Sequence, residues 1–108
     1  VSGSKLIVVL GHTHCGAIQS AIDDVKMGNI TSLLSKIKPA VEKANSFYKG
    51  DKSSKNDEFM DAVCHLNVQI SIDEIRSKSP ILKEMEDLNE IMIVGAIYDM
   101  KTGKVDFL

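Results

Sequence analysis

His12 and Cys15 are the residues whose types and spacing could do chemistry in this sequence. Imidazole nitrogen and thiolate sulfur are ligands that zinc takes in a tetrahedral site, at about 2.0 to 2.3 Å. A three-residue step across a tight turn can place one of each on the same ion. A catalytic zinc needs three protein ligands and an exchangeable position, so at least one more ligand must come from elsewhere.

The same pair also has a purely structural interpretation. His12 could be a hydrogen-bonded turn histidine, and Cys15 a buried cysteine at the start of a helix; spacing alone leaves both interpretations open. His14 is interpreted as a surface or pocket-rim residue that could shuttle protons, because histidine titrates near neutral pH. Cys64 and His65 point about 100° apart on a helix, which favours a core cysteine beside a partly exposed histidine over a metal pair.

The strand that must deliver His12 is the apolar run Leu6 to Leu10, which ends at Gly11. An unbroken run, in place of alternation, predicts a parallel strand buried on both faces. Ligand sites in such sheets gather at the carboxyl ends of the strands. A helix starting after Cys15 would favour the thiolate, because its N-terminus carries unpaired N–H groups and partial positive charge.

The rest of the chain reads as helices followed by two strands. Helical spacing of apolar residues predicts helices over 17–25 with Gly28 as C-cap, 30–44 with a break before Pro39, 57–76 and 79–88. A second apolar run over 91–97 predicts another buried strand, and 104–108 alternates as an edge strand of a hairpin. This order predicts an α/β fold with a mostly parallel sheet flanked by helices and a C-terminal edge hairpin strand.

The motif residues then identify a family by resemblance. Gly11-His12-Thr13-His14-Cys15-Gly16-Ala17 resembles the zinc-ligand motif of the β-class carbonic anhydrases, in which a strand ends in Gly-His-Ser/Thr-x-Cys-Gly. The similarity covers nearly the whole chain in the right order. It continues at Asn67-Val68, Ser79-Pro80-Ile81-Leu82, Ile93 to Asp99, and Thr102 to Val105.

This resemblance implies a zinc enzyme that hydrates carbon dioxide to bicarbonate and a proton. It implies His12 and Cys15 as zinc ligands, and the backbone N–H of Gly16 as a donor to a bound anion, while no catalytic acid or base can be named. The family's first cysteine ligand and its Asp-Arg pair lie in an upstream Cys-x-Asp-x-Arg segment that these residues do not supply. The sequence therefore resembles the C-terminal half of such an enzyme, and we expect these 108 residues to be inactive alone.

Composition sets the remaining expectations. With 44% hydrophobic and 26% charged residues and a net charge of -2, residues 1–108 are expected to form a single domain that binds neither nucleic acid nor membrane. Two cysteines, one inside a metal-type motif, favour a reducing compartment, and we expect a cytoplasmic protein. The resemblance also implies a homodimer or a higher even oligomer.

The sequence leaves two alternative functions open, and the resemblance has one consequence for the stability of the chain. The chain could be a non-catalytic carbonic-anhydrase-like module with a regulatory or interaction role, or Cys15 could be a redox-active or metal-sensing thiol. By resemblance, the Lys5 to Leu10 strand is central in the whole fold, so without its upstream neighbour it becomes an exposed apolar edge. We therefore expect no stable monomer, but copies that bury Leu6 to Leu10 against one another or aggregate.

Overall fold

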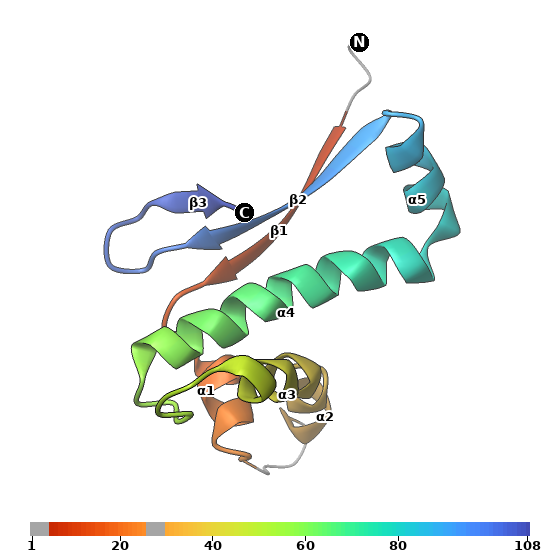
Figure 1. Cartoon of the computed structure of the whole chain (residues 1–108). Helices are drawn as coiled ribbons and strands as arrows, with labels where there is room; N and C mark the ends of the chain where they lie inside the picture. The colour runs from red at the N-terminus through yellow and green to blue at the C-terminus, as the bar shows by residue number, and fades with distance from the viewer. Residues whose placement is uncertain (1–4, 26–29) are drawn as a thin grey trace.

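The computed structural model describes residues 5–25 and 30–108, which form an α/β arrangement of helices and strands (Figure 1). This confirms the fold class expected from the sequence. Within these ranges no helix is both long and apolar enough to cross a bilayer. The elements, in chain order, are β1 (Lys5–His12), α1 (Gly16–Ile22), α2 (Ile30–Ser35), α3 (Lys38–Phe47), α4 (Asp57–Lys78), α5 (Pro80–Asp87), β2 (Ile91–Tyr98) and β3 (Val105–Phe107).

The strands form one sheet in the order β1-β2-β3. β1 and β2 are parallel over their whole lengths, with Val9 opposite Gly95 and His12 opposite Tyr98. β3 returns antiparallel to β2 and places Phe107 opposite Ala96. The parallel pair and the C-terminal edge hairpin are both as the sequence predicts, and β1 forms the other edge of this sheet.

Helix α4 lies between the sheet and the smaller helices. It contacts β1 and β2 on one side and α1 and α3 on the other (Figure 1). Two glycines let it approach the strands closely, because a Cβ added at Gly11 or at Gly95 would lie 2.8 Å from a Val68 methyl carbon. A side chain at either strand position would push α4 away from the sheet.

The largest cluster of buried side chains joins α1, α2, α3 and α4. Phe59 and Val63 of α4 are fully buried there, and the Phe59 ring packs edge-on against Tyr48 with centroids 5.2 Å apart. Small residues such as Ala40 and Ala44 of α3, both 0% exposed, let the helices come close together. This cluster is a core formed between helices, on the side of α4 that faces away from the sheet.

The expectation that β1 is buried on both faces is wrong for this chain. Leu6, Val8 and Leu10 are 57%, 41% and 57% exposed, and Met92 of the neighbouring strand is 61% exposed. The alternate positions, Ile7 and Val9, are partly covered because they face α4. Every helix that covers the sheet belongs to the connection from β1 to β2 and lies on the same side of it (Figure 1).

Helix boundaries differ from the expectations in two places. α1 ends at Ile22, three residues before the expected Val25, and Asp24 beyond it has a left-handed backbone with φ of 56°. The predicted cap at Gly28 lies outside the described residues. The predicted break before Pro39 is confirmed, since α2 ends at Ser35 and α3 begins at Lys38 with Pro39 in its first turn.

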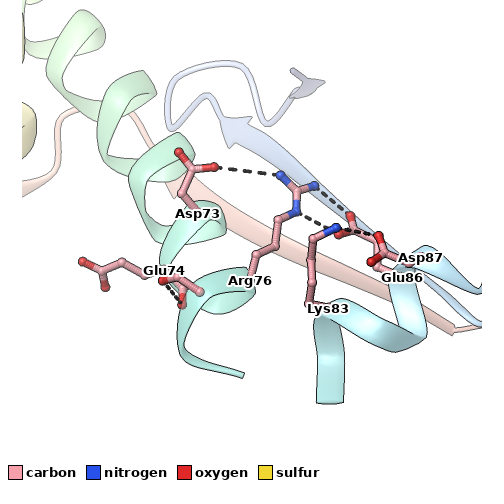
Figure 2. A network of polar contacts seen from close by, with 7 residues as sticks. Asp73, Glu74, Arg76, Lys83, Glu86 and Asp87 are labelled. Atoms are coloured by element: carbon pink, nitrogen blue, oxygen red, sulfur yellow. Dashed lines mark hydrogen bonds and ion pairs between the residues drawn. The ribbon is translucent and has the colours of Figure 1, made fainter. Parts of the chain in front are cut away.

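A group of ion pairs joins the end of α4 to α5 (Figure 2). Arg76 donates from Nε and Nη2 to the two carboxylate oxygens of Glu86, at 2.9 and 2.8 Å. Asp73 approaches the same guanidinium at 3.9 Å, and Lys83 pairs with Asp87 one turn away on α5. The two-point contact of Arg76 fixes the orientation of α5 more firmly than a single ion pair would.

Candidate metal centre

The candidate ligands lie where β1 passes into α1. β1 ends at His12, and α1 begins at Gly16 with Cys15 as its N-cap residue. Between them His14 has a φ of 53°, a left-handed conformation that non-glycine residues rarely adopt. This sharp turn brings His12 and Cys15 to the lining of one cavity of about 240 Å³.

The ring of His12 is oriented by the adjacent backbone. Its Nδ1 lies 3.0 Å from the carbonyl oxygen of Thr13. When Nδ1 carries the proton and donates to that carbonyl, Nε2 keeps its lone pair. A histidine held in this way is suited to bind a metal through Nε2.

The thiol of Cys15 is available for a similar role. Its backbone is extended, with φ -72° and ψ 121°, and its side chain makes no capping hydrogen bond to α1. The residue is half-buried and lines the same cavity as His12 and Asn67. Asn67, which is part of the family resemblance in the sequence, is brought to this cavity by α4.

Cys64 also lines this cavity, but it is poorly suited to be a third ligand. Its Sγ donates to the carbonyl oxygen of His12 at 3.5 Å, so the proton has a partner. Burial, followed by the neighbouring Cys15, raises the pKa of the Cys64 thiol to about 11. Zinc binds the thiolate, which this environment disfavours. As the sequence suggests, Cys64 is a core cysteine and the adjacent His65 is exposed.

The two candidate ligands are of the types that zinc binds, but they are fewer than a zinc site needs. His12 and Cys15 offer one nitrogen and one sulfur, but residues 5–25 and 30–108 contain no group of three or more His, Cys, Asp or Glu side chains that could hold a metal ion. A structural or catalytic zinc takes at least three protein ligands. No reaction step follows from these residues alone.

Sequence reasoning missed the role of Thr13. Its backbone N–H donates to the carbonyl oxygen of Tyr98, and its Oγ1 accepts from the Met100 N–H, both at 3.0 Å. Asp99 in turn stabilises the β2–β3 turn by accepting from the Lys101 N–H at 2.8 Å, a bond that lowers the pKa of Asp99. Thr13 thus connects the loop between His12 and Cys15 to the β2–β3 turn, which is distant in sequence. In the sequence, only the hydroxyl group at that motif position indicated this connection.

His14 and Gly16 lie at the outer side of the loop. His14 Nδ1 is 4.0 Å from the Asp57 carboxylate at the start of α4, and both side chains are exposed. Gly16 is exposed, and a Cβ placed on it would meet nothing within 4 Å. The surface position expected for His14 is confirmed, and the space beside Gly16 is open.

Comparison with known proteins agrees with this geometry. The carbonic anhydrase family profile matches residues 1–105. A carbonic anhydrase of Candida albicans is 32% identical over 106 residues, which cover 92% of this chain and 35% of that protein. Two solved structures, the β-carbonic anhydrases of Aspergillus fumigatus and of Coccomyxa, superpose with TM-scores of 0.76 at 24% identity.

The superpositions cover nearly all of this chain but only about half of each solved chain. The two superpositions cover 95% and 96% of this chain, but 48% and 46% of the solved chains. A tetrameric β-carbonic anhydrase of Sordaria macrospora is similar, with a TM-score of 0.75, 21% identity, and coverage of 95% of this chain and 51% of that one. The chain therefore belongs to the carbonic anhydrase family and has the fold of part of a β-class enzyme.

Proposed function

We propose that this chain supplies the His12–Cys15 part of the zinc site of a carbonic anhydrase that interconverts carbon dioxide and bicarbonate. The observation that carries the proposal is the placing of both side chains on one cavity at the end of β1, in a chain of this family. His12 would bind through Nε2 and Cys15 through Sγ. The zinc would supply an activated water for addition to carbon dioxide.

The remaining parts of the activity need residues that this chain does not provide. Two ligands leave a zinc ion weakly held, so we expect these residues alone to lose zinc and to hydrate carbon dioxide at the background rate. Dialysis against a mild chelator followed by zinc analysis, together with a stopped-flow hydration assay, measures both. Stoichiometric zinc after dialysis with hydration above background would contradict the proposal.

The ligand assignment is tested in a protein that joins these residues to the upstream half of the Candida albicans relative. There, His12→Ala and Cys15→Ala should each remove zinc and activity together, because two remaining protein ligands cannot hold the ion. His14→Ala is the matched control from the same loop and should keep the zinc. A Cys15→Ala protein that retained zinc and activity would show that the ligand is elsewhere.

The proposal also covers anion binding at Gly16, the cellular compartment and the oligomeric state. The open space at Gly16 supports a role for its N–H in holding a bound anion such as bicarbonate. Two cysteines without a disulfide, Cys15 and Cys64, support a reducing, cytoplasmic setting. Assembly as a homodimer or higher even oligomer is supported by the tetrameric relative from Sordaria macrospora.

A non-catalytic carbonic-anhydrase-like module is the second candidate, and the incomplete donor set is the observation that favours it. The joined protein separates the two proposals. If it binds zinc and hydrates carbon dioxide only with His12 and Cys15 intact, the catalytic proposal stands. If it folds but neither binds zinc nor hydrates carbon dioxide, the module is the better description.

A further inference from the structure

Thr13, which follows His12 in the loop, is fixed by three polar contacts. Its N–H donates to the carbonyl oxygen of Tyr98 at 3.0 Å, which extends the parallel pairing of β1 and β2 by one bond. Its Oγ1 accepts from the N–H of Met100 at 3.0 Å. Its carbonyl oxygen lies 3.0 Å from His12 Nδ1. The amide, hydroxyl and carbonyl groups of this one residue are therefore all engaged.

The Thr13 hydroxyl accepts a hydrogen bond that regular strand pairing would give to the Thr13 carbonyl. In a parallel pair, a residue that donates its N–H to one residue of the partner strand accepts, through its carbonyl, from the N–H two positions further along that strand. Thr13 donates to Tyr98, so the regular acceptor for the Met100 N–H would be the Thr13 carbonyl oxygen. That N–H is bonded to Oγ1 instead. The carbonyl is thereby free to face the His12 ring.

The direction of the Thr13 carbonyl decides which nitrogen of His12 can bind a metal. A carbonyl oxygen can only accept, so a hydrogen bond at this contact requires the proton on Nδ1 and leaves the lone pair on Nε2. Zinc binds an unprotonated ring nitrogen, and the partner of the other nitrogen sets the tautomer. The Thr13 hydroxyl thus acts on His12 through the carbonyl of its own residue.

The Met100 N–H is supplied by a closed turn. The Asp99 carboxylate accepts from the Lys101 N–H at 2.8 Å. The Asp99 backbone donates to the Lys104 carbonyl and accepts from the Gly103 N–H, both at 2.8 Å. A donor fixed in this way loses little conformational freedom when it meets the hydroxyl. The turn is therefore a firm anchor for the loop.

We propose that Thr13 is a positioning residue of the candidate metal centre. Its hydroxyl, held by the β2–β3 turn, directs the Thr13 carbonyl at His12 and keeps Nε2 available for zinc. The turn thereby becomes part of the metal centre, although Met100 lies 87 positions from Thr13 in the sequence. The inference rests on the proposed function for the identity of the metal, whereas the positioning is a property of the metal-free chain.

The tautomer of His12 in the metal-free chain tests the positioning. Long-range proton–nitrogen NMR correlation, at a pH where histidine is neutral, distinguishes a proton on Nδ1 from one on Nε2. In the wild type we expect the proton of His12 mainly on Nδ1. Thr13→Val has a similar shape without the acceptor, and should shift the ratio of the two tautomers by about tenfold toward Nε2–H. Thr13→Ser keeps the hydroxyl and should retain the wild-type tautomer.

Thr102→Val is the matched control within the same turn. Thr102 Oγ1 accepts from the Lys104 N–H at 3.3 Å, so this variant removes a threonine hydroxyl from the turn and leaves the hydroxyl of Thr13 in place. The His12 tautomer should not change. Circular dichroism shows whether each variant is folded. If Thr13→Val does not fold, the wild type decides: a proton on Nδ1 with a Met100 amide protected from exchange supports the proposal, and a proton on Nε2 overturns it.

Zinc affinity in the joined protein tests the consequence for the metal. Thr13→Val should raise the zinc dissociation constant by about tenfold, as loss of a ligand's hydrogen-bond partner does, while Thr13→Ser and Thr102→Val should leave it unchanged. Competition with a chelator measures all three. An unchanged constant in Thr13→Val, or equal weakening in Thr102→Val, would overturn the inference. A joined wild type that binds no zinc would refute the proposed function, and the His12 tautomer of the metal-free chain would still decide the positioning.

Discussion

The helical cluster and the sheet of this molecule use similar apolar residues with opposite results. In the cluster, Phe59 and Val63 are fully buried between four helices. In the sheet, Leu6 and Leu10 are more than half exposed, although their sequence context is at least as apolar. α4 contacts both regions and covers only the sheet face that it touches. An apolar run thus becomes core only where the chain also supplies an element to cover it.

The largest expected contrast comes from truncating one residue in each region. Phe59→Ala should lower the free energy of unfolding by about 3–5 kcal/mol, because it leaves a cavity in a closed core. Leu10→Ala, at a residue 57% exposed, should cost under about 1 kcal/mol in the monomer. Urea unfolding at low protein concentration measures both. Equal losses would show that the sheet face is as well packed as the helical cluster.

The boundary between the two regions is tested at Gly95. A Cβ there would lie 2.8 Å from Val68 Cγ1 and 3.1 Å from Ile72 Cδ1, so Gly95→Ala should cost about 1–3 kcal/mol by overpacking. Combining it with Val68→Ala should cost less than the sum of the two single changes, because the smaller side chain relieves the clash. Gly16→Ala, where space is open, is the control for unfolding measurements. Strict additivity would mean that α4 shifts freely on the sheet.

The smallest expected effect concerns the polar connection at the end of α4. The Arg76 guanidinium lowers the pKa of the Glu86 carboxyl below its ordinary value, so the folded state favours the ionised form. The contribution of this pair is therefore present above the ordinary pKa of Glu86 and is lost as the pH falls through the lowered value. Arg76→Gln should remove that acid dependence.

Hydrogen exchange of the α5 amides as a function of pH measures this effect. In the wild type we expect faster opening of α5 at acid pH, and in Arg76→Gln we expect opening that is already faster at neutral pH and less sensitive to acid. Lys78→Gln is the control, because its contact with Glu74 is 3.8 Å long and largely exposed. Unchanged exchange in Arg76→Gln would show that apolar contacts alone hold α5.

The candidate site could be predicted in part from the sequence, because its two candidate ligands are close together in the chain. His12 and Cys15 are joined by a short turn, so their spacing and the preceding apolar run place them at a strand end. The link between Thr13 and Met100 spans 87 positions, and apart from the Thr13 hydroxyl nothing local in either segment indicates it. The burial of Cys64 and its bond to the His12 carbonyl likewise depend on how α4 crosses the sheet.

In helix α4 the spacing of apolar residues does not predict all of the packing partners. The helical spacing predicts one core-facing stripe of Phe59, Val63, Leu66, Ile70 and Ile75. The first four lie in or against the helical cluster, whereas Ile75 lines a pocket with Val9 of β1. Val68 is also buried, because α4 has a second apolar side against the strands. A helix that is apolar on two sides gives no clear single stripe, so its two partners cannot be assigned from spacing.

The sequence by itself determined the order of strands and helices, the parallel pair and the turn that carries His12 and Cys15, because these follow from local periodicity and turn chemistry. Only the tertiary structure decided which face of the sheet is covered. All the covering helices belong to one connection between adjacent parallel strands, so they lie on one side. The apolar run of β1 is equally hydrophobic on both faces, and its residues alone could not show that one of them stays open.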